Sequence, residues 1–182
     1  MRKHQGISFI EVLVSLVVLS TGIIGAVAMQ ASAKKGSFDA MQRSMASALA
    51  QDIIERMRSN DSDPASLENY QGTYGDGSLS APSNRCNDPD NPCNSLEMVS
   101  NDLYEWEQKL RGSYVTQGSK SLGGLIGARG CVDHTNQSVT VVVSWQGRVS
   151  SQDSADSDNT LAFNCGSATD KRRQVEISAF IF

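Results

Sequence analysis

The hydrophobic residues of the chain are concentrated at its start. A run from Ile7 to Met29 contains one charged residue, Glu11, and follows two basic residues, Arg2 and Lys3. A helix over this run spans about 34 Å at 1.5 Å per residue, enough to cross a hydrocarbon core about 30 Å thick. The basic segment before it predicts that the N-terminus stays cytoplasmic and that the remainder is exported.

Two ordinary explanations of this segment fit less well. A secretory signal peptide has a shorter apolar region and ends at a small-residue cleavage site, whereas this helical pattern continues. A plain membrane anchor accounts for the length but not for Glu11, because a carboxylate in an apolar helix is costly unless it finds a partner. Glu11 is therefore a candidate functional residue; the alternative is that its side chain reaches the cytoplasmic membrane surface.

The helical pattern extends beyond the apolar run. It predicts one continuous helix from about residue 7 to 58, whose second half packs against the rest of the chain. A cluster of helix breakers from Ser59 to Pro64 should end this helix. Gly22 and Gly25 are compatible with close helix packing or with local melting on assembly. The apolar stripe of the second half consists of Phe38, Met41, Met45, Leu49, Ile53 and Met57, with Ala48 and Ile54 beside it.

A second helix is predicted over residues 95–111. Asn94 and Glu97 resemble a capping box at its start, and Gly112 suits its end. Its apolar stripe is Leu96, Val99, Leu103, Trp106 and Leu110.

The remaining pattern predicts a small sheet. Short connections between the strands favour antiparallel pairing, so we expect an α+β fold with a long N-terminal helix packed along the sheet and an additional short helix. Residues 60–94 and 150–159 are expected to be irregular. The strand patterns occupy residues 114–117, 128–132, 138–145 and 172–182.

Four cysteines in an exported domain predict disulfides, for which three pairings are possible. We favour Cys86–Cys93, which closes a short turn, and Cys131–Cys165, which would tie a strand to the loop before the last strand. Each should contribute about 2–4 kcal/mol. A zinc site using His134, or a calcium site in residues 86–93, is disfavoured because the ligand patterns are incomplete. We therefore expect no metal.

The composition argues against an enzyme and against a nucleic-acid-binding protein. The chain carries a net charge of −4, so it would repel phosphate, and the basic residues 171–173 are expected to form the solvated edge of a strand. His4 precedes the apolar run and His134 stands alone, so no catalytic triad is formed. Residues 123–127 lack the lysine of a phosphate-binding loop. We expect no cofactor.

The start of the apolar run resembles the N-terminal signal of type IV pilins and type II secretion pseudopilins. Gly6 is followed by Ile7, and Glu11 is the fifth residue after the glycine. In these families a prepilin peptidase cuts after the glycine and methylates the new N-terminal amine. The resemblance implies cleavage between Gly6 and Ile7, and an apolar helix that serves first as membrane anchor and then as filament core. Ile7 departs from the family, in which Phe is usual at this position.

The resemblance also gives Glu11 a role in filament assembly. Its buried carboxylate would pair with the Ile7 amine of a neighbouring subunit. Leaving either charge alone would cost about 3–5 kcal/mol, so the pair would disfavour wrong axial registers.

Further segments resemble PilV-type minor pilins, also called type IV pilus modification proteins. This resemblance implies a type IV pilin fold and a low-abundance subunit that primes or supports pilus assembly near the tip. The alternatives are a minor pseudopilin of a type II secretion system and a membrane-anchored surface adhesin. The similar segments are residues 49–60, Asp102, Leu103, Trp106, Cys131, residues 139–145, Cys165, Gly166, Arg172 and Arg173.

The expected organisation follows from these resemblances. Residues 1–6 are a cleaved leader, 7–31 the transmembrane and filament-core half of the helix, 32–59 its amphipathic half, and 60–182 an exported head. The protein should span the bacterial inner membrane once, with its head periplasmic, and then enter the pilus at the cell surface. Expected partners are the inner membrane, prepilin peptidase, other major and minor pilins, and the pilus assembly machinery.

Overall fold

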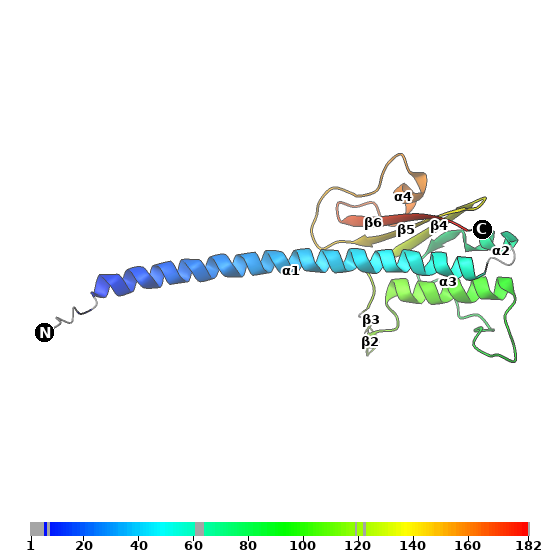
Figure 1. The fold of residues 1–182 in the computed structure, drawn as a ribbon, viewed down its shortest axis with the longest axis horizontal. Coiled ribbons are helices and arrows are strands. Elements are labelled where there is room, and N and C mark those ends of the chain that lie inside the picture. Colours follow the sequence, from blue (N-terminus) through cyan, green and yellow to red (C-terminus); the bar gives the residue numbers. More distant parts are fainter. Residues whose placement is uncertain (1–5, 7, 61–63, 119, 122, 182) are drawn as a thin grey trace. The chain divides into compact units, whose positions relative to one another are not determined.

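A computed structural model gives the fold of the chain (Figure 1) and describes residues 6, 8–60, 64–118, 120, 121 and 123–181. The chain forms two compact units, residues 1–40 and 41–182. Helix α1, Phe9–Ser59, continues from the first unit into the second. The long helix, small antiparallel sheet and short helices place the fold in the α+β class, as predicted.

The first unit consists of the N-terminal part of α1. Its large apolar side chains, from Phe9 at 79% exposure to Met29 at 75%, have no covering layer within the unit. By length and composition α1 is able to cross a membrane, and it is the one such helix among the described residues. An apolar surface of this extent requires lipid or other protein chains around it.

The second unit is built on a four-stranded antiparallel sheet in the order β1-β4-β5-β6. β5 pairs with β6 along its whole length, from Ser138 opposite Phe180 to Gln146 opposite Arg172. β4 and β5 form a hairpin whose turn includes Asn136 at a φ of +57°, a conformation that asparagine tolerates. The strand bounds are β1 Gly72–Tyr74, β4 Arg129–Thr135, β5 Ser138–Gln146 and β6 Arg172–Phe180, and a separate pair is formed by β2 Thr116–Gln117 and β3 Lys120–Ser121.

Helix α3, Ser95–Arg111, has the predicted capping box. The side chain of Asn94 accepts a hydrogen bond from the Glu97 amide at 3.0 Å, and Glu97 accepts one from the Asn94 amide at 3.0 Å. Gly112 ends the helix in the left-handed conformation, at a φ of +64°. The shorter helices are α2 Pro64–Leu67, the 3₁₀ helix η1 Glu68–Tyr70 and α4 Thr160–Asn164.

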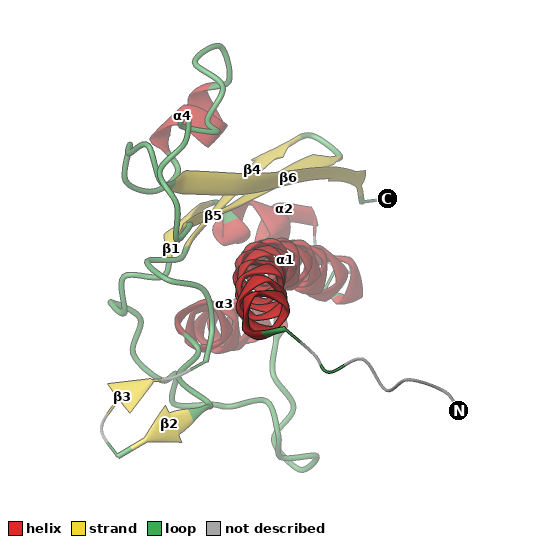
Figure 2. Ribbon diagram, turned by 90° about the vertical axis from the view of Figure 1, so that its left-hand side faces the viewer, coloured by secondary structure: helices red, strands yellow, loops and turns green. Residues whose placement is uncertain are grey.

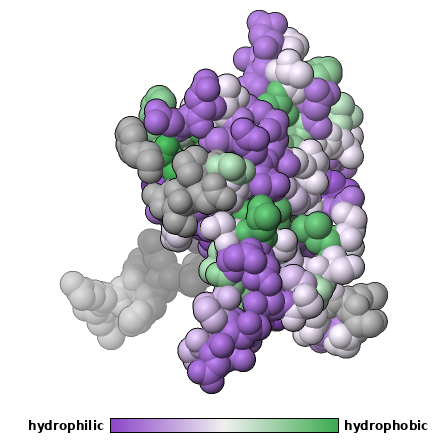
Figure 3. Space-filling view, turned by 90° about the vertical axis from the view of Figure 1, so that its right-hand side faces the viewer, coloured by the Kyte–Doolittle hydropathy of each residue, from purple (hydrophilic) through white to green (hydrophobic). Residues whose placement is uncertain are grey.

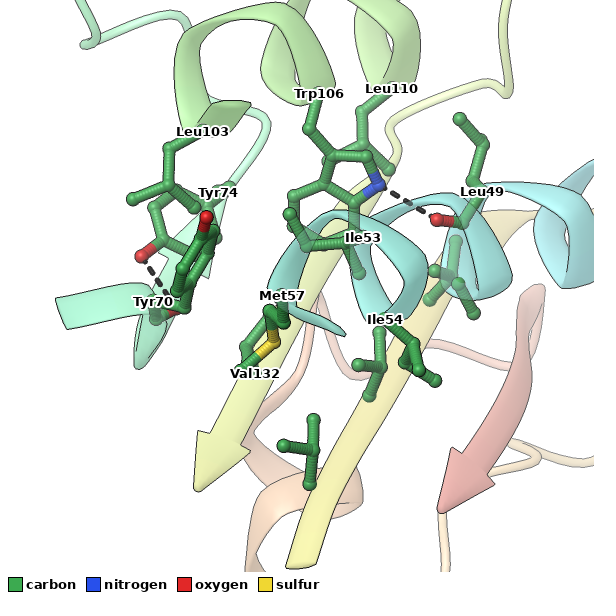
Figure 4. Close-up of a cluster of buried hydrophobic side chains, with 14 of the residues drawn as sticks. Leu49, Ile53, Ile54, Met57, Tyr70, Tyr74, Leu103, Trp106, Leu110 and Val132 are labelled. Atoms are coloured by element: carbon green, nitrogen blue, oxygen red, sulfur yellow. Dashed lines mark hydrogen bonds between the residues drawn. The ribbon is translucent and has the colours of Figure 1, made fainter. Parts of the chain in front are cut away.

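The core of the second unit lies between α1, α3 and one face of the sheet (Figures 2 and 4). Ala46 and Ala50 of α1 are fully buried, and their small side chains allow close contact between the helix and its neighbours. Trp106 of α3 is also fully buried and donates a hydrogen bond from Nε1 to the Leu49 carbonyl at 2.8 Å. Most of the remaining core comes from Ile53, Ile54, Met57, Tyr70, Tyr74, Leu103, Leu110, Val132, Val139, Val141, Val143 and Trp145.

The stripe predicted for α1 is wrong at its beginning. Met41 and Met45 are 53% and 36% exposed, and the buried face starts instead with Gln42 and Ala46. Large side chains on that face would hold the helix away from its neighbours. Leu96 of α3, expected in the core, is 57% exposed because it lies in the first turn of the helix.

Two further expectations need correction. Residues 60–94 were expected to be irregular, yet they contain α2, η1 and β1, which depend on contacts with distant segments: β1 pairs with β4. The basic residues 171–173 were expected to be solvated, yet Arg172 is only 1% exposed. Its partners come from segments that local patterns do not connect.

The structure joins Cys86 to Cys93 and Cys131 to Cys165, the two pairs favoured above. The second disulfide belongs to a small cluster with Val142 and with Ala162 of α4. This cluster covers the face of the sheet opposite α1 (Figure 2).

The end of the second unit seen in Figure 3 is largely hydrophilic, with small separate hydrophobic areas. This face therefore carries no apolar surface as extensive as that of α1 in the first unit.

Candidate processing and assembly segment

The predicted cleavage site precedes α1. Gly6 is exposed and lies outside the helix, whereas Ile7 lies outside the described residues. The Ser8 carbonyl begins the helix, accepting hydrogen bonds from the amides of Glu11 at 3.0 Å and Val12 at 3.3 Å. A glycine in an exposed, non-helical segment suits a peptidase, which must bind the backbone on both sides of the bond that it cuts.

Glu11 lies in the first turn of α1 and is exposed. A carboxylate is favourable at this place because the positive end of the helix dipole is near. Within the part of the chain that the structure describes, no cation forms an ion pair with Glu11. Its charge is thus available to a partner from another molecule.

The other polar side chains of the apolar run are satisfied by the helix itself. The hydroxyl of Ser15 donates to the Val12 carbonyl at 2.8 Å, and that of Ser20 donates to Val17 at 3.0 Å. Thr21 donates to carbonyls one turn earlier as well. Such bonds let hydroxyls enter an apolar environment at little cost. Glu11 is the one polar side chain in residues 9–29 that still needs a partner.

An open, mainly apolar surface surrounds Glu11 on the helix. It is formed by Ile10, Val14, Val18 and Leu19 together with Ser15. A second apolar helix placed against this side would surround the carboxylate with hydrocarbon. The charge would then need a cation at the same level.

The glycines of the apolar run have no intrachain packing role. A Cβ added at Gly22 or Gly25 would meet no described atom within 4 Å. Both residues are nevertheless helical in this structure.

Comparison with known families agrees with this site. Residues 1–27 match the prokaryotic N-terminal methylation motif, and residues 28–104 match the family of type IV pilin Tt1218. The chain is a type IV pilin-like protein. No curated protein and no solved structure matches it significantly.

These two matches account for the architecture and for the N-terminal segment. The long helix with a small antiparallel sheet is the type IV pilin fold. The methylation motif implies processing by prepilin peptidase and association with pilins, and the apolar helix fits a membrane-anchored pilin. Type IV pilins are structural proteins rather than enzymes.

An ionic cluster in the second unit was missed by sequence reasoning. Arg56 of α1 donates to Asp102 Oδ1 at 2.7 Å and to Glu105 Oε2 at 3.0 Å, both on α3. The Tyr70 hydroxyl donates to the second oxygen of Asp102 at 2.7 Å. The only local signal was the spacing of Asp52 and Arg56, whose side chains approach to 3.4 Å.

The cluster shifts the pKa values of its members. Burial alone would raise the pKa of Glu105, but hydrogen bonding to Arg56 and the charge of that residue lower it overall. Burial, reinforced by the hydrogen bond to Asp102, raises the pKa of Tyr70 far above its usual value. Glu105 is therefore ionised at neutral pH and Tyr70 is a neutral donor. The cluster links the end of α1 to α3.

Proposed function

We propose that this type IV pilin-like chain is a minor pilin of the PilV type, which primes or supports pilus assembly and is incorporated in the pilus near its tip. The observation that carries the proposal is the spacing of Gly6 and Glu11 at the start of α1, whose first part exposes its apolar side chains. The segments that resemble PilV-type pilins support the finer assignment. Among them, residues 49–60 and Trp106 meet in the core, where Trp106 bonds Leu49.

In the proposed pathway, residues 1–6 are a leader that prepilin peptidase removes at Gly6–Ile7. Residues 7–31 first anchor the chain once in the bacterial inner membrane, with the head, residues 60–182, in the periplasm. Residues 32–59 join the two parts. After cleavage, Ile7 carries an N-methylated amine, and the assembly machinery transfers the chain into a pilus at the cell surface.

Assembly would then use Glu11 as a register marker. When the apolar helices of major and minor pilins pack together, the Glu11 carboxylate is removed from water and needs a cation. The N-terminal amine of a neighbouring pilin supplies that charge, and a misplaced subunit would leave one charge unpaired, at a cost of about 3–5 kcal/mol.

Replacing Glu11 tests this role. We expect Glu11→Val to be exported and cleaved normally but to be absent from sheared filaments, because the neighbour's amine would be buried without a counter-charge. Ser15→Ala, one turn further along the same surface, is the matched control and should be incorporated like the wild type. The measurements are immunoblots of the sheared-filament and membrane fractions, with N-terminal mass spectrometry. Wild-type levels of Glu11→Val in filaments would contradict the role, and a chain starting at unmodified Met1 would contradict the processing.

Deletion of the chain separates the pilin from the alternatives. Loss of surface pili and of twitching is expected for a minor pilin. A secretion defect with normal pili would instead identify a minor pseudopilin of a type II secretion system. Normal pili and normal secretion would leave a surface adhesin.

A further inference from the structure

The outer edge of strand β6 is open. β6 is the last strand in the sheet order, and its odd-numbered residues direct their backbone groups toward β5, as Gly147 bonding Lys171 and Ile181 bonding Gln137 show. The even-numbered residues therefore direct theirs outward. Accordingly, the Arg172 carbonyl accepts a hydrogen bond from Ser154 at 3.0 Å, and the Phe180 carbonyl accepts one from Arg58 at 3.5 Å.

Between these two points the edge lacks partners. Among the described residues, no hydrogen bond is made by the outward backbone groups of Gln174, Glu176 and Ser178. β6 is nine residues long, regularly paired, and contains neither proline nor lysine. Proteins usually protect an edge from further strands with a short strand, a bulge, proline or lysine, and β6 has none of these features.

An irregular segment of the chain, residues 151–154, lies beside the start of this edge. The Ser151 amide donates to the Asp170 carbonyl at 2.8 Å, and Ser154 reaches the Arg172 carbonyl. The segment then turns away into α4 and leaves the following positions uncovered. The start of the edge thus already accepts hydrogen bonds from another segment of the chain.

The side chains of β6 specify the kind of segment that would fit. Val175, Ile177 and Ala179 face the core but are only half-buried, because no strand lies beyond them. Glu176 and Ser178 alternate with them and are exposed on the other face. An added strand with apolar residues at every second position would complete the cover of the inner face.

Strand polarity argues against a symmetric pair of this chain. β6 runs in the same direction as the second-unit part of α1, since its last residue, Phe180, approaches Arg58 near the end of that helix (Figure 1). Antiparallel pairing of two β6 strands would place the two α1 helices in opposite directions. Pilins that are anchored in one membrane, or packed in one filament, have parallel helices.

A neighbouring subunit of the same fold presents the required polarity. β1 runs opposite to β6, because each successive pair of strands in the sheet is antiparallel. The corresponding edge of a neighbour with a parallel α1 would therefore meet β6 in antiparallel orientation. A second copy of this chain offers only the three residues Gly72–Tyr74 there, which would leave most of the edge unpaired.

We propose that the β6 edge around residues 174–180 binds, by antiparallel strand addition, an edge strand of a different pilin-like subunit. This inference rests on the proposed function, in which the chain lies beside other pilins with parallel helices. The contact would join the two sheets laterally and would be independent of the Glu11 contact in the apolar helices.

The test uses a photoreactive benzoylphenylalanine in place of Glu176 in the full-length chain, made in the cells that assemble the pilus. Ultraviolet light should give a covalent product with another pilin-like subunit, and mass spectrometry should place the cross-link in an edge strand. The same probe in place of Asp88, an exposed residue in the Cys86–Cys93 turn, is the control and should not give this product. Absence of the product would overturn the inference, as would a cross-link to a second copy of β6 or to lipid.

Two changes at Ser178 separate the backbone from the side chain. Ser178→Pro removes an outward amide without breaking a bond to β5, and should reduce the Glu176 cross-link by about tenfold or more. Ser178→Ala removes only the hydroxyl that contacts Thr140 at 3.0 Å, and should leave the cross-link unchanged. Unfolding midpoints of both variants check that the second unit remains folded. An equal effect of the two changes would contradict strand addition.

The outcome also distinguishes this inference from the proposed function. If the chain is present in sheared filaments and the Glu176 probe gives no cross-link, the edge proposal fails and the pilin assignment stands. If the chain is absent from filaments and its deletion leaves pili intact, the proposed function fails first.

Discussion

Arg172 connects three segments of the second unit through a single side chain. Its Nε and Nη2 atoms donate to the two carboxylate oxygens of Asp153 at 2.7 and 2.8 Å. Nη1 donates to the carbonyl of Phe163 at 2.8 Å and lies 3.4 Å from those of Cys165 and Gly166. The irregular segment of residues 150–159, helix α4 and residues 165–166 are thereby bonded to the start of β6. Three adjacent basic residues in the sequence gave no indication that the middle one would be buried.

Replacing Arg172 tests this connection. We expect Arg172→Ala to lower the free energy of unfolding by about 3 kcal/mol at pH 7, because it removes charge-assisted hydrogen bonds and leaves buried carbonyls without donors. The adjacent Lys171→Ala, an exposed position, should change it by less than about 0.5 kcal/mol. Urea unfolding with the disulfides intact measures both. A similar loss in the two variants would show that the effect is not specific to Arg172.

The stability difference between the wild type and Arg172→Ala should also depend on pH, in a direction set by the pKa of Asp153. Hydrogen bonding to Arg172 lowers the pKa of Asp153 below its usual 3.8, so this carboxylate stabilises the fold above that value and loses its contribution as the pH falls through the lower, folded pKa. The difference in stability between wild type and Arg172→Ala should therefore shrink below about pH 4. A difference that is constant from pH 7 to pH 3 would contradict an ionic role for the pair.

At the scale of elements, α3 is positioned by contacts of two adjacent residues, Trp106 and Glu107, that face in different directions. Glu107 is fully buried and accepts hydrogen bonds from the amides of Gly75, Gly77 and Leu79 at 3.0–3.1 Å, which fixes the loop after β1. Trp106, the preceding residue, faces the other way, toward α1 and the sheet (Figure 4). Neighbouring residues on one helix thus connect it to a loop, a helix and a strand.

Gly130 of β4 provides the test of the Trp106 contact. A Cβ added there would overlap the Trp106 ring, so Gly130→Ala should displace α3 and destabilise the second unit by about 1–3 kcal/mol. Gly36→Ala makes the same chemical change in α1, where a Cβ meets no described atom within 4 Å, and should not destabilise the protein. Thermal unfolding and near-ultraviolet circular dichroism of a Trp145→Phe background, in which Trp106 is the remaining tryptophan, measure the effects. An unchanged tryptophan signal in Gly130→Ala would mean that the ring is not held against β4.

Elements with a strong local pattern could be predicted, and elements that depend on distant contacts could not. The periodicity of α3 and its capping residues predicted both of its ends, and the alternation in residues 138–145 predicted β5 to within one residue. β1 was not predicted, since three residues ending in Tyr74 form a strand only through pairing with β4. The Gly6–Glu11 spacing is a local signal, and residues 1–27 match the N-terminal methylation motif, whereas the roles of the two residues stay predictions. The Arg56 cluster was not predictable, because its carboxylates come from α3, more than forty residues away.

For the whole molecule, the disulfides compensate for a small core. The hydrophobic content of the chain, 39%, includes the apolar run of α1, so the rest of the chain has a lower share of apolar residues. Small domains with limited cores commonly rely on covalent links. Here one link lies in the surface turn of residues 86–93, and the other is buried, with Cys131 at 2% and Cys165 at 0% exposure.

Their unequal loop lengths and burial predict unequal contributions. In the chain-entropy description, the Cys131–Cys165 bond, with a separation of 34 residues, is worth about 4 kcal/mol, and Cys86–Cys93, with a separation of 7, about 2.5 kcal/mol. We expect the double variant Cys131→Ser with Cys165→Ser to lose more stability than Cys86→Ser with Cys93→Ser. Urea unfolding of the protein measures both.

The order in which a reductant opens the two disulfides provides an independent check of their difference in burial. Without reduction, alkylation of the mature protein should label none of the four cysteines. Under mild reduction with a dithiol, Cys86 and Cys93 should be labelled first, because the attacking thiolate must reach a sulfur atom and the other bond is enclosed by Val142 and Ala162. Labelling of Cys131 before Cys86 would show that the small cluster opens more readily than the surface turn.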